Sequence, residues 1–258
     1  MKYFLIAAVS LFLICAGYSA EKKNPAGKLL GEELILYINF DDGKGAPLLM
    51  EGEITQKTSK KKLKFSDRGI FGKALVGGNC TYLTEFENLD FGKDGTLVYW
   101  IALMSNDPAL DAKSISAISL GPSTPAWLLF QRQGWKKSCN LMAVMYIPKK
   151  RGPLTRVFGI SKTTQWKIAE WHMVTVSWTA SSLSIAIDDG TKNSLTPLLS
   201  PLPVLYGDPT GVIKKLSVGI PDHTLAIDEI MVFNKKLSPE EIKKLYEESV
   251  KNAGGIQK

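Results

Sequence analysis

The sequence predicts an all-β protein, built as a two-sheet antiparallel jelly-roll sandwich with one short C-terminal helix. Three observations lead to this fold class. Many short segments rich in β-branched and aromatic residues alternate with Gly, Pro and Ser turns. Only one segment, close to the C-terminus, has the signature of an amphipathic helix. The 258 residues are 45% hydrophobic, which suffices for the core of one domain.

The first 33 residues precede the predicted domain. Residues 1–20 read as a signal peptide, with Lys2 as the charged start, an apolar run over 4–15 and a small-residue exit. The run is shorter than the roughly 20 residues that cross a bilayer. Residues 21–33 read as a flexible lead-in. We therefore expect a secreted, periplasmic or cell-surface protein with no membrane span.

The predicted domain covers residues 34–249, and 250–258 form a tail. Segments bounded by turn signals predict its strands in order: 34–40, 81–86, 96–103, 115–120, 127–131, 141–147, 157–160, 173–178, 183–188, 212–218 and 225–233. Residues 56–64 read as a solvated hairpin loop with its flanking strand, and the glycines within 69–79 predict a tight turn region. Three prolines within 195–206 predict an extended crossing loop.

The last strand leads into a helix whose start is specified by the sequence. Ser238 is the expected N-cap, Pro239 stands at the first helical position, and Glu241 completes a capping box. Ile242 and Leu245 begin a narrow apolar stripe that continues to Tyr246. We expect this helix to pack on the sheet that the last strand joins.

Four stretches together resemble laminin G-like, concanavalin A-like jelly-roll domains. They are ILYINFDDG (35–43), GTLVYWIAL (95–103), the pair WHMVTVSW and LSIAIDDG (171–190), and the closing IDEIMVFNKKLSPEEIKKLY (227–246). They occur in the order of that family and span most of the chain. The resemblance implies that the first and last strands are neighbours in one sheet. It does not imply one function, because this fold serves lectins, glycosidases and adhesion modules.

Acidic residues at the ends of the first and last strands suggest a metal site. Asp41 ends the first strand and Asp228 lies at the start of the last. Carboxylates with turn carbonyls suit the oxygen-rich shell of Ca²⁺, and the resemblance implies a structural calcium at these two positions. The alternative is that Asp41 caps a turn and Asp228 accepts hydrogen bonds from loop amides.

Two cysteines remain after the signal peptide, Cys80 and Cys139. An even number of cysteines in an oxidising compartment favours a disulfide. The alternative is a pair of buried free thiols, since cysteine is among the most buried residue types.

Catalytic motifs are weak in this chain. Glycoside hydrolysis needs two facing carboxylates, but the TEFENLD stretch (84–90) does not match the glucanase pattern Glu-x-Asp-x-Glu. No Gly-x-Ser-x-Gly or His-Glu-x-x-His motif is present. His172 sits in the Trp-His pair that the family uses structurally. We therefore expect a protein without catalytic activity, with a glycan-cleaving enzyme as the runner-up.

The remaining features favour binding. The formal net charge of +7 is mild, and basic residues do not cluster with aromatics as in nucleic-acid binders. Trp127, Trp135 and Trp166 lie outside the family's core motifs, and exposed indoles can stack on sugar rings. We predict an exported binding module for an extracellular glycan or a surface protein. A structural envelope component that binds only proteins is a further alternative.

Overall fold

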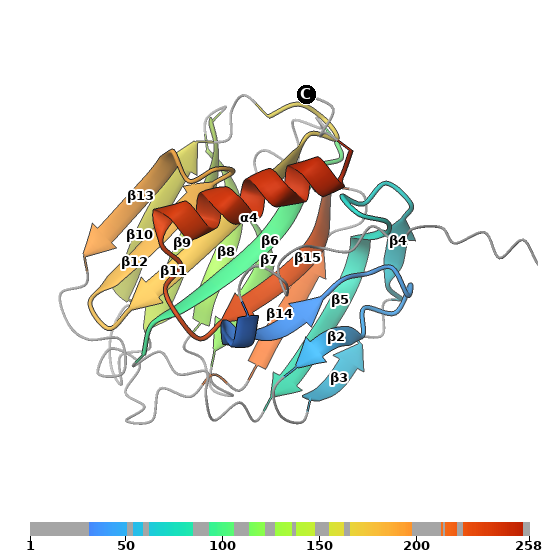
Figure 1. Cartoon of the computed structure of the whole chain (residues 1–258), viewed down its shortest axis with the longest axis horizontal. Coiled ribbons are helices and arrows are strands. Elements are labelled where there is room, and N and C mark those ends of the chain that lie inside the picture. The colour runs from blue at the N-terminus through green and yellow to red at the C-terminus, as the bar shows by residue number, and fades with distance from the viewer. Residues whose placement is uncertain are drawn as a thin grey trace, which may run out of the picture.

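The computed structural model describes residues 31–50, 54–58, 62–84, 93–105, 114–121, 127–135, 138–147, 155–162, 166–197, 213, 215–220 and 224–254. Within them lie fifteen strands, a short 3-10 turn and one α-helix (Figure 1). The strands are β1 Leu34–Ile38, β2 Pro47–Met50, β3 Ile54–Thr58, β4 Lys64–Ser66, β5 Ala74–Thr84, β6 Gly95–Leu103, β7 Ser114–Gly121, β8 Trp127–Trp135, β9 Ser138–Ile147, β10 Thr155–Lys162, β11 Trp171–Thr179, β12 Ser182–Ile187, β13 Lys192–Pro197, β14 Lys215–Ile220 and β15 Leu225–Phe233. The helix is α4, Pro239–Asn252, and the 3-10 turn is Gly31–Glu33.

The strands form two antiparallel sheets that share one long strand. The first sheet has the order β2-β1-β15-β6-β11-β12-β13 and the second β10-β9-β8-β7-β14-β5, with β3 and β4 also on β5. β5 connects them, because Leu75 pairs with Ile227 of the first sheet while its later residues pair with β14 of the second. The predicted all-β sandwich class is therefore confirmed.

The two ends of the domain pair with each other. β1 runs antiparallel to β15, with Leu34 opposite Phe233 and Ile38 opposite Ile230. β15 also pairs with β6, so the last strand lies between the first strand and the strand that carries Trp100. The neighbouring first and last strands expected from the sequence are thus observed.

Strand β6 shows why the core has two compartments. All nine of its residues are buried. Leu97, Tyr99 and Ile101 pack between the sheets, whereas Val98 and Trp100 pack on the outer face. Successive side chains of a strand point to opposite faces, so a strand buried on both faces must be covered on both.

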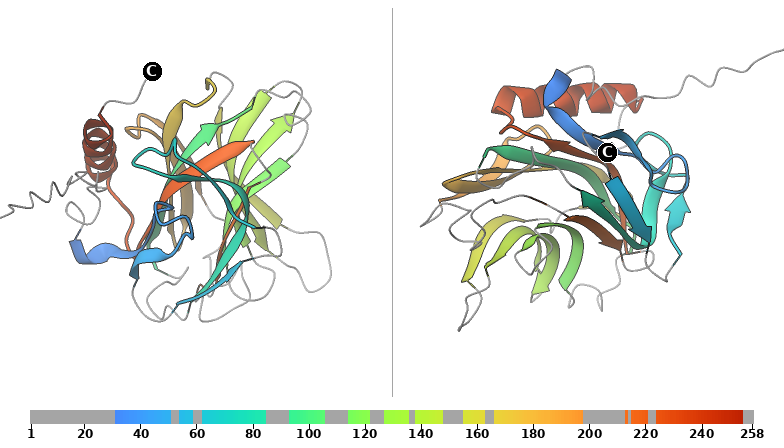
Figure 2. Two further views of the ribbon diagram at one scale, coloured as in Figure 1. Left: turned by 90° about the vertical axis from the view of Figure 1, so that its right-hand side faces the viewer. Right: turned by 90° about the horizontal axis from the view of Figure 1, so that it is seen from below.

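Helix α4 covers the outer face of the first sheet, which gives three layers in order: helix, first sheet, second sheet (Figure 2). Ile242 and Leu245 are buried, and the Tyr246 ring stacks on Trp100 at 5.8 Å. The capping box is present: Glu241 N–H donates to Ser238 Oγ at 3.2 Å, and Ser238 N–H donates to Glu241 Oε2 at 2.8 Å.

Two segments differ from the expectation. Residues 74–79 belong to strand β5 and not to a turn. The interval 56–64, expected as a loop with its flanking strand, contains the end of β3 and the start of β4. The first part of 195–206 belongs to β13, whose Pro197 lies opposite Ser182 at the edge of the first sheet. Proline is tolerated there because an edge strand has one side without ladder partners.

Candidate functional site

A polar cluster lies where β11 begins. The Trp166 indole stacks on the His172 imidazole, with ring centroids 4.1 Å apart and planes 15° from parallel. His172 is the second residue of β11 and is 9% exposed, whereas Trp166 is half-buried. Trp166 also packs against the core between the sheets. An aromatic side chain is thus fixed at the end of the sandwich, partly open to ligand.

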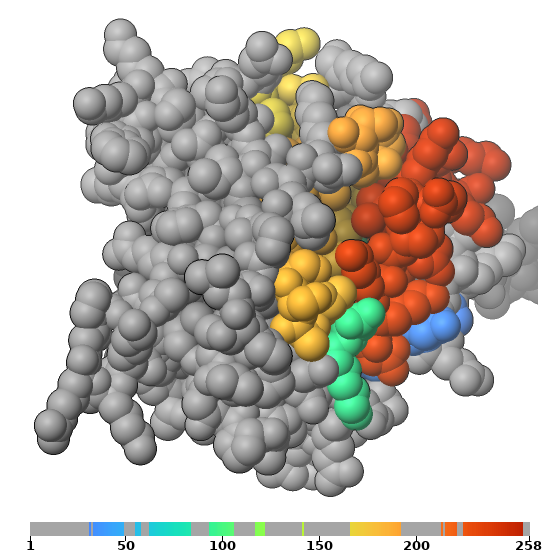
Figure 3. All heavy atoms as spheres, turned by 90° about the vertical axis from the view of Figure 1, so that its left-hand side faces the viewer, coloured from blue at the N-terminus to red at the C-terminus, as the bar shows by residue number. Residues whose placement is uncertain are grey.

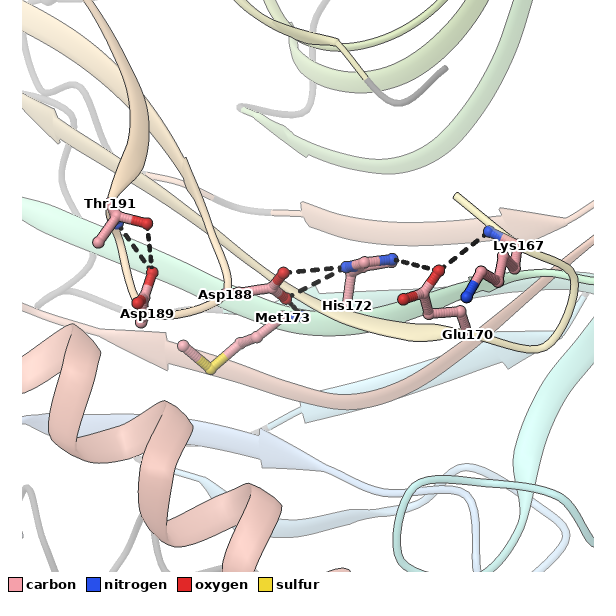
Figure 4. Close-up of polar contacts among 7 residues, drawn as sticks. All are labelled: Lys167, Glu170, His172, Met173, Asp188, Asp189 and Thr191. Atoms are coloured by element: carbon pink, nitrogen blue, oxygen red, sulfur yellow. Dashed lines mark hydrogen bonds and ion pairs between the residues drawn. The ribbon is translucent and has the colours of Figure 1, made fainter. Parts of the chain in front are cut away.

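The first carboxylate of the cluster comes from the turn after β12. Nδ1 of His172 lies 3.0 Å from Asp188 Oδ2, and Met173 N–H donates to Asp188 Oδ1 at 3.1 Å (Figure 4). Asp188 has a φ of 56°, in the left-handed region that Asp tolerates better than most residues. This conformation takes Asp188 out of the alternation of β12 and leaves its carboxylate beside the imidazole.

The second carboxylate comes from the loop before β11, residues 166–170, which we call the Trp166 loop. Glu170 Oε2 lies 3.7 Å from His172 Nε2 and accepts the Lys167 N–H at 3.0 Å. The loop is docked on the end of β6, because Ala169 N–H donates to Leu103 O at 2.7 Å. Ile168 at the loop tip is 48% exposed.

Several titratable groups at this end of the molecule have shifted pKa values. The Lys167 N–H holds the pKa of Glu170 below its usual value, helped by the charge of His172. Hydrogen bonds from Thr191 lower the pKa of Asp189. Burial, followed by the charges of Asp188, Asp189 and Glu170, raises the pKa of Tyr246 to about 12.

The turn after β12 also contacts the helix. Ile242 Cγ2 would lie 3.3 Å from a side chain added at Gly190. Figure 3 shows α4 and the β11–β12 hairpin side by side on one face of the molecule. The turn that carries Asp188 is therefore packed against α4 through Gly190.

Two carboxylates beside a Trp raise the question of glycosidase chemistry. Glu170 and Asp188 lie on opposite nitrogens of His172, so the imidazole fills the space between them. The two carboxylates of a glycosidase must flank the glycosidic bond, with water or sugar between them. This pair therefore does not form that arrangement. Residues 85–92, which include Glu85, Glu87 and Asp90, lie outside the described residues.

The other predicted tryptophans lie on the second sheet. Trp127 and Trp135 are the first and last residues of β8. Their side chains are outside the described part of the structure. The three tryptophans therefore do not come from one element: Trp166 belongs to a loop of the first sheet.

Asp41 and Asp228 flank the same turn, residues 69–72. Asp41 Oδ1 accepts Lys73 N–H at 2.7 Å, and its Oδ2 accepts Asn39 Nδ2–H at 3.1 Å. Asp228 Oδ2 accepts Ile70 N–H, and its Oδ1 accepts Glu229 N–H, both at 2.9 Å. Burial, then the charges of Glu229 and Asp41, raises the pKa of Asp228 well above its usual value.

This geometry tests the fit of a calcium ion. Ca²⁺ takes six to eight oxygen ligands, whereas all four oxygens of the pair already accept N–H donors. Within the described residues no three His, Cys, Asp or Glu side chains are grouped as a metal site. The donor set matches the alternative in which the carboxylates hold loop amides. Calcium at Asp41 and Asp228 stays a prediction.

The expected disulfide is not observed. Cys80 is a buried free thiol in β5, and Gln56 Nε2–H donates to its Sγ at 3.2 Å. Cys139 lies opposite Gly134 in β9, with β8, β7 and β14 between it and β5. The four steps between neighbouring strands amount to roughly 19 Å. A disulfide joins Cα atoms about 4.4 to 6.8 Å apart, so the free-thiol alternative is the one observed for Cys80.

The comparisons with known proteins identify the fold. No family model matches the chain, and no curated protein matches its sequence. The botulinum neurotoxin serotype D binding domain is similar in structure, with a TM-score of 0.63 and 14% identity over 84% of this chain and 51% of that chain. This chain thus spans about half the length of the neurotoxin domains that it matches.

Two further structures were solved with sugars. One is the serotype D ligand-binding domain in complex with N-acetylneuraminic acid, with a TM-score of 0.59 and 13% identity over 84% of this chain and 51% of that chain. The other is domain 4 of AbnA, a GH43 extracellular arabinanase from Geobacillus stearothermophilus, in complex with arabinotriose. Its TM-score is 0.52, with 18% identity over 83% of this chain and 100% of that chain. At such identities the likeness shows the fold alone. The laminin G-like assignment within this class stays a prediction.

The sequence interpretation missed the carboxylate partners of His172. The structural role expected of His172 agrees with its burial, but Glu170 and Asp188 were not expected to face it. The register of the β11–β12 hairpin could have predicted the position of Asp188. β11 and β12 are joined by a tight turn with Thr179 opposite Ser182, and counting back from it brings residue 188 next to Met173.

Proposed function

We propose that this protein is an exported, non-catalytic module that binds an extracellular glycan through the end of the sandwich that carries the Trp166 loop. The observation that carries the proposal is the half-buried Trp166 ring, which stacks on His172, whose two nitrogens face Glu170 and Asp188. Indole faces stack on the apolar faces of sugar rings, and carboxylates accept hydrogen bonds from sugar hydroxyls. One aromatic platform with a few fixed polar groups is the usual composition of a small-ligand site.

Two points support a glycan over a protein partner. Two of the solved domains with this fold were obtained with a bound sugar, arabinotriose in one and N-acetylneuraminic acid in the other. The exposed apolar surface near the site is small, because Ile168 and Leu48 are the large exposed hydrophobic residues of the described chain. Protein interfaces generally need a larger apolar centre.

Export rests on the sequence. Residues 1–20, the expected signal peptide, lie outside the described residues. In the described part of the chain, no helix is both long and apolar enough to span a bilayer. We propose a secreted, periplasmic or cell-surface location, which N-terminal sequencing of the exported protein tests directly.

A glycan array tests the binding function. The chain from residue 21 should bind a defined set of glycans, and Trp166→Ala should weaken binding by about tenfold, the equivalent of a ring contact worth roughly 1.4 kcal/mol. Trp166→Phe keeps an aromatic face and should retain most of the affinity. Ile168→Ala, in the same loop, controls for loop disturbance.

The alternatives have their own readouts. Release of reducing sugar from a polysaccharide panel would establish a glycan-cleaving enzyme. A blank array, combined with specific capture of a surface protein from the same envelope, would establish the protein-binding alternative. Binding that is equal in wild type and Trp166→Ala would place the glycan elsewhere, with Trp127 and Trp135 of β8 as the next residues to test.

A further inference from the structure

The His172 imidazole joins two segments that are distant in sequence. Its Nδ1 contacts Asp188, which follows β12, and its Nε2 faces Glu170 of the Trp166 loop. Its face is covered by the Trp166 ring. A single side chain therefore lies between the loop that carries the proposed platform and the rest of the first sheet.

The groups that contact the His172 imidazole show which of its two nitrogens carries a proton. A carboxylate only accepts hydrogen bonds, so the contact with Asp188 at 3.0 Å requires a proton on Nδ1. In the neutral ring Nε2 then carries a lone pair. Nε2 is buried, has no hydrogen-bond partner among the described residues, and lies 3.7 Å from Glu170 Oε2. A lone pair facing a carboxylate is repulsive, whereas an N–H at the same place is attracted to it.

The stacking of His172 on Trp166 also favours the protonated imidazole. An imidazolium over an indole face gains a cation–π attraction that a neutral imidazole lacks. All three contacts of His172, with Asp188, Glu170 and Trp166, are therefore stronger when the ring carries its second proton.

We infer that His172 is a positioning residue that holds the Trp166 loop in place as an imidazolium, so that ligand binding at this loop strengthens when the ring gains its second proton. The binding part of this inference rests on the function proposed above. The loop-holding part does not, because it concerns the free protein. Loss of the second proton leaves the Asp188 contact and removes the attraction to Glu170, which frees the loop at its Glu170 end.

The charged groups around the ring set the limits of this effect. Among the described residues, Asp188 and Glu170 face the ring, Lys167 and Asp189 lie beside these carboxylates, and Tyr246 of α4 lies within their field. The pKa of Glu170 is lowered, so its stabilising charge is present above its usual pKa and is lost as the pH falls through the lowered value. The attraction between the imidazolium and Glu170 is therefore lost again where Glu170 takes up a proton.

The free protein provides a test that needs no ligand. The chain holds two histidines, His172 and His223, so its NMR spectrum contains two imidazole Hε1 signals, and His223→Gln assigns them. The indole Nε1–H signal of Trp166, assigned with Trp166→Phe, should shift with the same midpoint as His172. After correction for intrinsic rates, exchange of the Ala169 amide, which donates to Leu103, should be several-fold slower at about pH 5.5 than at about pH 8. His172→Gln, which cannot carry the charge, should abolish that difference.

The same glycan array, read at the two pH values, tests the consequence for binding. We expect several-fold tighter binding at the lower pH in wild type and in His223→Gln. In His172→Gln the affinity should no longer depend on pH, and in Glu170→Gln, which keeps the Asp188 and Trp166 contacts, the dependence should be weaker. An Ala169 amide whose exchange is the same at both pH values, or a Trp166 signal that does not follow His172, overturns the inference even if the array is positive. A pH-dependent loop together with a blank array instead contradicts the proposed function and leaves the positioning role standing.

Discussion

At the scale of single residues, Gly72 shows how tightly the turn at 69–72 is packed on its carboxylates. A Cβ at Gly72 would lie 2.1 Å from Asp41 Oδ1, and one at Gly69 would lie 2.6 Å from Asp228 Oδ2. Forcing extra atoms into such a site typically costs about 1–3 kcal/mol. We expect Gly72→Ala to lower the free energy of unfolding by about that amount, measured by urea titration.

A second variant separates this clash from a general effect on the turn. Asp41→Ala removes the carboxylate that the new methyl group would meet, so Gly72→Ala should cost much less in that background. Residues in direct contact show such non-additivity, whereas independent sites add. Equal costs in both backgrounds would show that the methyl group does not act through Asp41.

Calcium at Asp41 and Asp228 makes a separate prediction for the same turn. An ion beside the buried carboxylate of Asp228 would offset the charge repulsion from Glu229 and Asp41. The melting temperature should then rise with added Ca²⁺, fall with chelator, and lose both responses in Asp41→Asn. A melting temperature that is unchanged by chelator would leave the two carboxylates with the role seen in the structure, that of holding the amides of Ile70 and Lys73.

The sequence predicted some of these residues better than others. The proximity of Asp41 and Asp228 was predicted, because the resemblance to jelly-roll domains implies that the first and last strands pair. It could not place Asp188 beside His172, since this depends on a φ of 56° that no residue pattern specifies. The Trp166 and His172 stack depends on the docking of a loop through the Ala169 amide, which is a tertiary contact with no local signal.

At the scale of elements, the start of α4 is set by its capping box. Ser238 Oγ accepts the Glu241 N–H, and the Glu241 side chain accepts the Ser238 N–H and contacts Lys235 Nζ at 2.8 Å. We expect Ser238→Ala to lower the free energy of unfolding by about 1 kcal/mol. Ser238→Asp retains an acceptor at the cap and should stay near wild type in the same denaturation assay. An alanine variant as stable as wild type would show that packing on the sheet alone fixes the helix.

Elements with local signals were predicted, and those without were not. The helix was predicted because its capping residues, Ser238 and Glu241, are recognisable in the sequence. Strand β5 was read in part as a turn because Gly77 and Gly78 are poor strand formers. Its Gly78 has a φ of 94°, and a Cβ there would lie 3.0 Å from Lys62 O. Glycine is needed at that point because the chain just before β4, at Lys62 and Leu63, lies close to β5, a contact that composition cannot reveal.

At the scale of the whole molecule, the layered arrangement followed from one property of the sequence. Strands β6 and β15 are rich in apolar residues, and β6, β11 and β15 are buried on both faces along almost their whole length. Such strands need a layer on each side, and the only described helix supplies the outer one. How the sheets connect was not predictable, because it depends on β5 leaving one sheet for the other. The course of β5 between the two sheets depends on many strand pairings between residues that are distant in sequence.

The position of β5 also decides the chemistry of the two cysteines. Because β5 and β9 are separated by three strands of the second sheet, Cys80 and Cys139 cannot approach without breaking that sheet. We expect the chain from residue 21, purified without reductant and unfolded in guanidinium, to show two reactive thiols with a thiol reagent. Cys80→Ala should show one. The melting temperature of the folded protein should not change with dithiothreitol, since no cross-link constrains its unfolded state. Absence of reactive thiols in the unfolded monomer would mean that the strand order of the second sheet is different, because only a rearranged sheet brings these two residues within bonding distance.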